Sequence, residues 1–183
     1  MRKKRTTISL PTLRKGWYSS NIDPNKPYER NFFVEGSQVI AVRNNSTQEL
    51  RKAVHTLAVY FKREFSYDFT QFSLNNDDST AYLFLSPHTL TPEPVGAACF
   101  RFRDTKMEDE TISPQWWFDW VWFHPYYRGK GILTKFLPII KKHHPNCLLT
   151  YPLSRSMEAF DKKHKLDARH HEQSPDVEGT DKE

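Results

Sequence analysis

A short glycine-containing turn is the part of the sequence whose residue types and spacing best fit a chemical role. Arg128, Gly129, Lys130 and Gly131 form it, and a helical pattern begins directly afterwards at Ile132. Glycine adopts backbone torsions that other residues avoid and lets a ligand approach the main chain closely. The N–H groups of such a turn and of the first helical turn have no partners within the helix, and the helix dipole adds partial positive charge. The segment therefore predicts an anion site suited to a pyrophosphate, with two cationic side chains beside it.

The spacing of the glycines excludes two common phosphate-binding motifs. A Walker loop requires Gly-Lys-Ser/Thr, and a dinucleotide fingerprint requires a third glycine and an acid for the ribose. The turn at 128–131 has neither pattern. Four such residues also occur in ordinary surface turns, so the prediction depends on the strand before the turn and the helix after it.

The same residues resemble the acyl-CoA motif of the GNAT acyltransferases, Arg/Gln-x-x-Gly-x-Gly/Ala after a strand that ends in Val-x-Pro. Arg128 and Gly131 match this motif, and Phe123-His124-Pro125 resembles the strand end. Leu133 departs from it, because the motif has Gly or Ala there, and the larger side chain would crowd the pantetheine arm. The resemblance extends from about residue 38 to residue 165 by the order of elements. It implies an α/β fold with an α+β mixed sheet, lacking the last strands of the family.

The resemblance also implies acetyl-CoA as acyl donor and an amine of a protein, a tRNA-linked group or a small molecule as acceptor. CoA would lie in a wedge between strands at 116–123 and 147–151. The backbone of Val121 and Phe123 would pair with the pantetheine amides, and the Val121 N–H would polarise the thioester carbonyl. The pyrophosphate would be held by the backbone N–H groups of Arg128, Gly129, Lys130, Gly131 and Ile132.

Asp119 is the candidate general base. Acyl transfer requires a neutral amine, so a group must remove its proton. Asp119 lies four residues before Phe123, where the resemblance implies a carboxylate base, and burial among the surrounding rings would favour its protonated form. The alternative is a structural ion pair with Arg101 or Arg103. Both interpretations remain open at the level of sequence.

Two further positions bear on proton transfer. His124 is a second candidate base because its ordinary pKa lies near neutrality, although its place before Pro125 favours a turn histidine. The resemblance implies a tyrosine general acid in the last helix, and the alignment puts Phe160 at that position. Phenylalanine cannot donate a proton, so another group or water would serve, or the site would bind CoA without turnover.

The tryptophans and the paired histidines have simpler interpretations. Trp120 and Trp122 alternate onto one face of a strand, which predicts core packing, whereas Trp116 and Trp117 lie nearer the strand start and could face the acceptor. The pairs at 143–144 and 170–171 lack a third ligand at metal spacing. We therefore expect both histidine pairs on the surface and no metal.

These residues need a framework of strands and helices to position them. Apolar residues three and four apart predict a helix from about residue 46 to 65, with Ser46 and Glu49 spaced as a capping box. Further helices are expected over 132–142 and 154–163. Strands are expected over 38–42, 81–85, 95–102, 116–123 and 147–151, with an acidic loop over 104–110. This order predicts an α/β domain around a mixed sheet.

Length and composition fit one such domain. The 183 residues predict a basic irregular arm over 1–30, the GNAT-like domain over 31–166 and a disordered polar tail over 167–183. No window holds eighteen consecutive apolar residues, and no apolar stretch follows the basic N-terminus, so we expect neither a membrane span nor a secretory signal. With two cysteines, a reduced cytoplasmic setting is expected.

The net charge of +5 leaves two alternatives to an enzyme. One is a non-catalytic CoA-binding module, which turnover of a thioester would distinguish. The other is a nucleic-acid-associated protein whose basic arm contacts phosphates, which a steep salt dependence of binding would reveal. Lysines and arginines crowd the first fifteen residues, and a solvated surface is the simpler interpretation of that excess.

Overall fold

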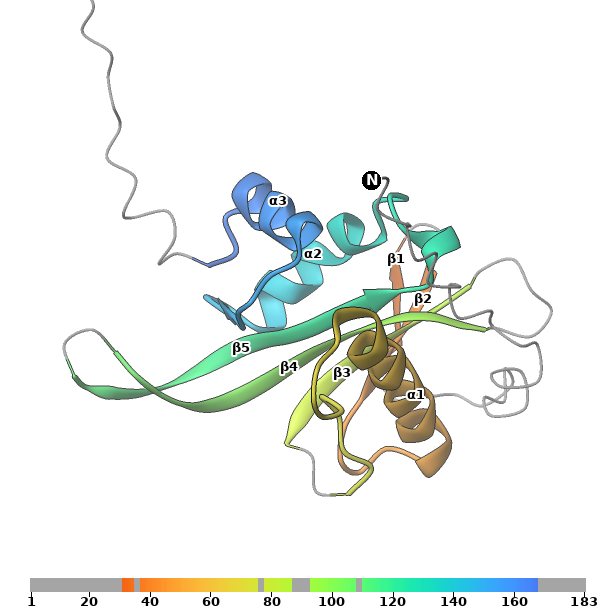
Figure 1. Ribbon diagram of the computed structural model, residues 1–183, viewed down its shortest axis with the longest axis horizontal. Helices are drawn as coiled ribbons and strands as arrows, with labels where there is room; N and C mark the ends of the chain where they lie inside the picture. Colours follow the sequence, from red (N-terminus) through yellow and green to blue (C-terminus); the bar gives the residue numbers. More distant parts are fainter. Residues whose placement is uncertain (1–30, 35–36, 76–77, 87–92, 108–109, 168–183) are drawn as a thin grey trace, which may run out of the picture.

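The fold is described from a computed structural model, which covers residues 31–34, 37–75, 78–86, 93–107 and 110–167 (Figure 1). The predicted basic arm lies outside the described residues, as does the predicted polar tail apart from Asp167. Among the residues that the structure describes, no helix combines the length and the hydropathy that a membrane crossing requires.

The described residues form one mixed sheet with helices on both faces. Its strands are β1 (Asn31–Val34), β2 (Ser37–Val42), β3 (Ser79–Leu85), β4 (Pro94–Lys106), β5 (Ile112–Phe123) and β6 (Leu148–Leu149), and they lie in that spatial order. Neighbouring strands are antiparallel except β5 and β6, which are parallel. The predicted α/β fold with a mixed sheet is confirmed; β1 is a strand that the sequence pattern did not predict.

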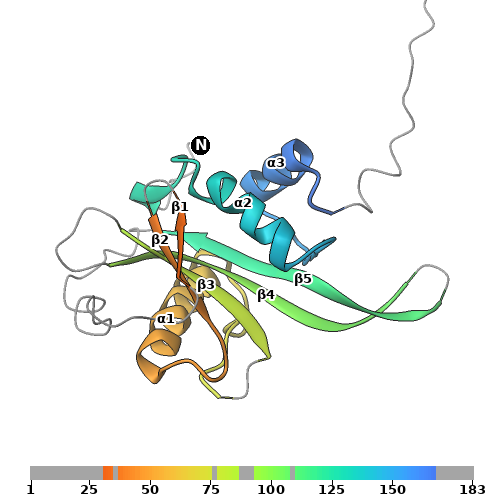
Figure 2. The ribbon, with the colours of Figure 1, turned by 180° about the vertical axis from the view of Figure 1, so that it is seen from behind.

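The helices divide between the two faces of the sheet (Figures 1 and 2). They are α1 (Gln48–Phe65), α2 (Ile132–His143) and α3 (Arg155–His164), and a short 3₁₀ helix, η1, spans Pro125–Tyr127. The apolar side of α1 packs on one face together with Trp120 and Trp122, which confirms their predicted place in the core. α2 and α3 pack on the other face, so the sheet is covered on both sides beside the turn at 128–131.

The start of α1 differs from its prediction. The helix begins after Thr47, which makes no side-chain cap. Ser46 does not form a capping box with Glu49, because its hydroxyl instead accepts a hydrogen bond from the Arg43 N–H (2.9 Å). The residue directly before the helix is Thr47 and not Ser46, so the predicted capping box is wrong.

The hairpin of β4 and β5 is much longer than its prediction. The sequence predicted an acidic loop over 104–110, but β4 continues to Lys106 and β5 begins at Ile112, with Asp104 opposite Pro114. The hairpin projects beyond the helices (Figures 1 and 2). Because both of its faces meet solvent there, polar side chains do not prevent ladder pairing.

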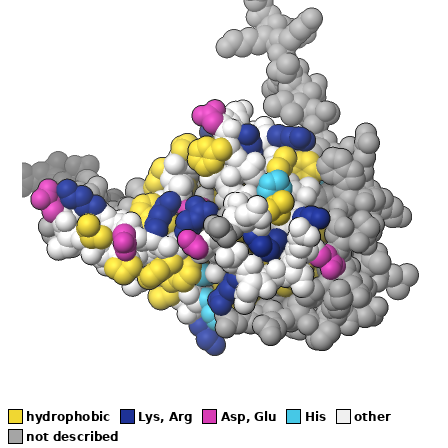
Figure 3. Space-filling view, turned by 90° about the horizontal axis from the view of Figure 1, so that it is seen from below, with side chains coloured by type: hydrophobic (Ala, Val, Ile, Leu, Met, Phe, Trp, Pro, Cys, Tyr) yellow, Lys and Arg dark blue, Asp and Glu magenta, His cyan; other side chains and the backbone are white. Residues whose placement is uncertain are grey.

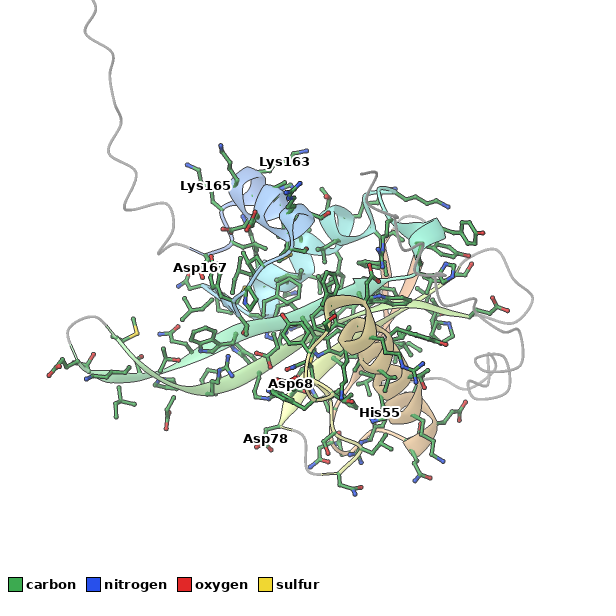
Figure 4. The ribbon with its side chains drawn as sticks, viewed as in Figure 1. His55, Asp68, Asp78, Lys163, Lys165 and Asp167 are labelled. Carbon is green, nitrogen blue, oxygen red and sulfur yellow. The ribbon has the colours of Figure 1, made fainter. Side chains whose placement is uncertain are left out.

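At the other edge of the sheet, β6 is shorter than the strand predicted over 147–151. The segment that follows α3 hydrogen-bonds to its main chain. The Leu149 N–H donates to the Asp167 carboxylate (2.8 Å), and Asp167 is fully buried. Figure 4 shows Asp167 below α3, at the end of the described chain. The first residue of the predicted polar tail is thus part of the folded domain.

His144 was expected on the surface, and that expectation is wrong. Its side chain is 2% exposed, hydrogen-bonds to the Tyr82 hydroxyl (2.8 Å) and stacks on Phe100 with ring centroids 4.2 Å apart. Burial, then the charges of His143 and Arg43, lower the pKa of His144 to about 3. The His170–His171 pair lies outside the described residues.

The buried histidine makes stability depend on pH. Because the pKa of His144 falls from 6.5 to about 3 on folding, protonation favours the unfolded chain. The contribution of neutral His144 to the free energy of unfolding is complete above pH 6.5. It is lost as the pH falls towards 3, by up to about 1.4 kcal/mol per pH unit. Urea unfolding at pH 7, 6 and 5 should show this slope. His144→Phe should flatten it and His143→Gln should not; an equal slope in both variants would contradict the assignment.

Candidate functional site

A cavity of about 480 Å³ lies between the end of β5, the start of α2 and α3. The turn at 128–131 forms one part of its wall, and the backbone of β5 forms another. The end of α1 contributes Glu64 and Phe65. The structure thus brings together all the predicted CoA-binding residues: the lining includes Val121, Phe123, Arg128, Gly129, Lys130, Gly131 and Ile132.

An irregularity in β5 turns its main chain towards this cavity. The pairing with β4 shifts register between Cys99 and Phe100, which face Trp120 and Phe118, so Asp119 is one extra residue in β5. Such a bulge reverses which residues point their N–H and C=O groups to a given neighbour. Before it, the Phe118 carbonyl points to the β6 side, where it accepts from the Thr150 N–H (3.2 Å).

After the bulge, the main-chain N–H and C=O groups of the odd-numbered residues of β5 point away from β4. The His124 N–H donates to the Val95 carbonyl (2.8 Å), which makes this opposed pair a hydrogen-bonded one. Hydrogen-bonded and non-hydrogen-bonded pairs alternate in antiparallel ladders. The main-chain groups of Val121 and Phe123, opposite Ala98 and Gly96, therefore face the side where a pantetheine chain would lie.

The strands β5 and β6 part as the predicted wedge requires. Their ladder comprises only Trp117 with Leu148 and Phe118 with Leu149. A second, smaller cavity of about 50 Å³ lies at this parting, and rings of α1, β5 and the 65–67 segment line it. Both cavities are lined by Phe65, Val121, Ser154 and Met157. The two cavities therefore meet beside Val121.

The geometry of the turn explains its glycines. Gly129 and Gly131 have φ of 70° and 72°, a left-handed conformation that glycine adopts at least cost. An added Cβ would meet no atom within 4 Å at either position, so conformation, not crowding, requires glycine. The α2 ladder opens with the Lys135 N–H bonded to the Gly131 carbonyl. The N–H groups of 132–134 precede it at the positive end of the dipole, and the first turn has no acidic residue.

The Arg128 side chain, predicted to add positive charge beside the pyrophosphate, is already bound within the protein. It forms a two-pronged ion pair with Glu64 on α1 (2.7 and 2.6 Å) and donates to the Phe123 carbonyl (2.8 Å). Trp122 also donates to Glu64 (2.7 Å). Burial alone would raise the pKa of Glu64, but the hydrogen bonds from Arg128 and Trp122 hold it below its ordinary value. Arg128 thus fixes the turn to α1 and β5.

Sequence reasoning missed Glu64 altogether. The partners are 64 residues apart in the chain, and nothing local at Glu64 indicates its partner. Both cations predicted beside the pyrophosphate are exposed. Arg128 is held by Glu64, whereas the Lys130 ammonium lies 4.9 Å from the centre of the Tyr127 ring. A ligand anion would therefore meet Lys130 and main-chain N–H groups first.

Asp119 has the ion pairs that the sequence offered as the alternative to a base. Its carboxylate contacts both Arg101 (2.8 Å) and Arg103 (3.3 Å), and it accepts from the Thr150 hydroxyl (3.0 Å). The side chain is 2% exposed and lies in the wall of the smaller cavity. The carboxylate oxygens are therefore engaged by groups of β4 and by Thr150.

The other positions discussed from the sequence also have defined places. His124 is buried, its Nδ1 accepts from the Tyr126 N–H (3.3 Å), and burial followed by the Arg128 charge lowers its pKa. These contacts agree with a turn histidine. Phe160 lines the larger cavity, so an aromatic ring lies there without a hydroxyl. Leu133 also lines it and packs partly on the core.

A matched pair of variants tests the role assigned to Arg128. Arg128→Lys keeps the charge but cannot make the two-pronged contact with Glu64, so it should lower the free energy of unfolding by about 1 to 2 kcal/mol. Lys130→Gln removes an exposed charge and should change stability by less than about 0.5 kcal/mol. Urea unfolding at neutral pH measures both. Equal losses in the two variants would show that Arg128 does not fix the turn.

Comparison with known proteins agrees with this geometry. No protein-family model and no curated protein matches the sequence. Among solved structures, the xEco2 acetyltransferase domain bound to a K105-CoA conjugate matches with a TM-score of 0.54 at 15% identity, over 75% of this chain and 94% of that chain. A second structure of the xEco2 acetyltransferase domain gives 0.55 at 10% identity, over 77% and 95%.

A complex of the aminoglycoside N-acetyltransferase AAC(6')-Iy with CoA gives a lower TM-score of 0.44 at 12% identity, over 69% of this chain and 88% of that chain. The fold assignment rests on the two xEco2 structures, whose likeness spans nearly their whole length. The mixed sheet, the strands that part beside a cavity and the glycine turn before α2 agree with it. The chain therefore has the fold of the GNAT acetyltransferases.

Proposed function

We propose that the protein is an N-acyltransferase that moves the acetyl group of acetyl-CoA to an amine. One observation carries this proposal: a single cavity joins the N-terminus of α2 to the outward-facing main chain of β5. The first supplies N–H donors for a pyrophosphate. The second supplies the pairing groups of an extended strand, as the amides of a pantetheine chain need.

In this proposal each part of CoA meets a different part of the cavity. The pyrophosphate lies on the N–H groups of Gly129, Lys130, Gly131 and Ile132. The Arg128 N–H, predicted from the sequence as a further donor, instead donates to the Pro125 carbonyl (3.3 Å). The pantetheine follows Val121 and Phe123, so that the thioester reaches the meeting point of the two cavities. There the Val121 N–H donates to the carbonyl oxygen and stabilises the negative charge that develops on it.

The amine reaches the thioester from the smaller cavity, on the α1 side. Its proton passes to water, because the carboxylate oxygens of Asp119 are already engaged by Arg101, Arg103 and the Thr150 hydroxyl. We therefore propose that Asp119 shapes the bulge and the cavity wall and that it is a positioning residue.

The two cysteines, Cys99 and Cys147, are free and buried, which supports a reducing compartment such as the cytoplasm.

A non-catalytic CoA-binding module is the second candidate, and Phe160 favours it. The ring lines the cavity but offers no proton to the departing thiolate. The two candidates predict the same binding of acetyl-CoA and differ in turnover. Release of free thiol from acetyl-CoA in the presence of a panel of amines separates them.

Two substitutions at one position test the anion site. Gly131→Asn and Gly131→Asp have similar size, and both residues tolerate the left-handed conformation better than other residues with a side chain. Only Asp places a negative charge beside the pyrophosphate, so it should weaken CoA binding by about tenfold or more relative to Asn. Isothermal titration calorimetry at low salt measures both affinities. If Asp and Asn variants bind CoA equally well, the pyrophosphate does not lie on this turn.

A further inference from the structure

We infer that the Ser154 hydroxyl stabilises the departing thiolate of CoA by donating a hydrogen bond to its sulfur. This inference rests on the proposed acyl transfer, and it starts from the residues that line both cavities, which are Phe65, Val121, Ser154 and Met157. Among these, Ser154 is the residue whose side chain carries a polar hydrogen. Because the thioester is proposed to lie where the cavities meet, its sulfur has Ser154 as a neighbour.

The sulfur becomes an anion during the reaction. As the amine nitrogen bonds to the carbonyl carbon, the C–S bond breaks and its electron pair stays on sulfur. The amine's proton passes to water, and the thiolate later takes a proton from water. Met157 and Phe160 line the larger cavity and offer no donor, and an anion without a hydrogen bond is costly beside apolar groups. A hydroxyl at this point therefore stabilises a charge that develops only in the reaction.

Local structure holds the Ser154 oxygen in place. Ser154 is the N-cap of α3, with extended backbone torsions (φ −73°, ψ 153°), and serine is among the residues preferred at that position. Its hydroxyl oxygen accepts a hydrogen bond from the Met157 N–H (3.3 Å). A hydroxyl has one proton to donate besides its two lone pairs. The cap uses a lone pair, and none of the described residues accepts the proton, so a ligand can accept it.

The other hydroxyl groups of the smaller cavity already face acceptors. The Thr150 hydroxyl donates to the Asp119 carboxylate (3.0 Å). The Tyr67 hydroxyl faces the Pro152 carbonyl (3.5 Å). Tyr67 and Thr150 line only the smaller cavity, whereas CoA is proposed to lie in the larger one. Neither hydroxyl is therefore placed to meet the sulfur.

The other hydroxyl groups of the larger cavity lie away from the meeting point. Tyr127, Thr134 and Ser156 line this cavity but not the smaller one. The Tyr127 hydroxyl donates to Ser86 (3.1 Å), and Thr134 lies in the first turn of α2, at the pyrophosphate end. Among the hydroxyl groups that the structure describes in the cavity walls, that of Ser154 combines the required place with an available proton.

The pKa of the bound CoA thiol tests the inference without any turnover. The difference absorbance of the thiolate in the ultraviolet, followed against pH at saturating CoA, reports its ionisation. Ser154→Gly removes the hydroxyl, while glycine at an N-cap keeps most of the helix stability. The ionisation constant of the thiol should fall about tenfold in this variant, so that its pKa rises. Ser154→Thr keeps a hydroxyl and should restore the native pKa. Equal pKa values in the native and Ser154→Gly proteins would overturn the inference.

Kinetics with acetyl-CoA and an amine that the protein accepts give a second readout. Ser154→Gly should lower kcat by about tenfold to a hundredfold, because a hydrogen bond to an ionised group is lost. The KM for acetyl-CoA should hardly change, since the thioester sulfur carries no charge. Ser113→Gly is the matched control, because Ser113 lies outside both cavities on β5, in the hairpin that Figure 3 shows extending from the body of the molecule. An equal loss of kcat in both variants would overturn the role of Ser154.

The outcomes separate this inference from the proposed function. A thiol pKa that depends on Ser154 in a protein without turnover supports the contact with sulfur and counts against acyl transfer alone. Turnover combined with an unchanged thiol pKa in Ser154→Gly supports acyl transfer and overturns the role of Ser154. If calorimetry detects binding of neither CoA nor acetyl-CoA, the proposed function and this inference both fail.

Discussion

The parting of β5 from β6 is the constraint on which the rest of the molecule depends. Backbone N–H and C=O groups that leave a ladder must find another partner or water. Here β6 pairs with only two residues of β5, and the bulge at Asp119 then turns Val121 and Phe123 towards the space between the strands. The Phe123 carbonyl accepts from the Arg128 side chain, and a ligand with amide groups can pair with the other main-chain groups of this edge.

The arginines around the cavity already form ion pairs within the protein. Arg128 is paired with Glu64 and the Phe123 carbonyl, and Arg101 and Arg103 share Asp119. In the first cluster the charges balance, and the arginine serves the shape of the turn. In the second, two guanidinium groups share the Asp119 carboxylate at the wall of the smaller cavity. At the α2 end of the site, main-chain N–H groups rather than the Arg128 side chain are placed to meet an anion.

The sequence predicted the features that are encoded locally. The apolar spacing of α1, the glycine turn before α2 and the burial of Trp120 and Trp122 each follow from residues close together in the chain, and the structure contains all of them. Features that depend on distant partners were missed. Glu64 meets Arg128 only because α1 packs beside the turn, and His144 is buried only because Tyr82 and Phe100 on neighbouring strands surround it. Asp119 is an intermediate case. The sequence indicated Arg101 or Arg103 as its ion-pair partner but did not decide between that ion pair and a general base.

Main-chain amide shifts on adding acetyl-CoA report most directly whether CoA lies along the turn and β5, because side-chain substitutions cannot remove backbone N–H groups. In ¹H–¹⁵N correlation spectra of the labelled protein, we expect the largest changes at Gly129, Gly131 and Ile132 and at Val121 and Phe123, all with one shared Kd. The Lys106 and Glu110 amides at the hairpin tip should not move. Large shifts confined to other surfaces, or saturation without change at both the turn and the β5 edge, would contradict the account.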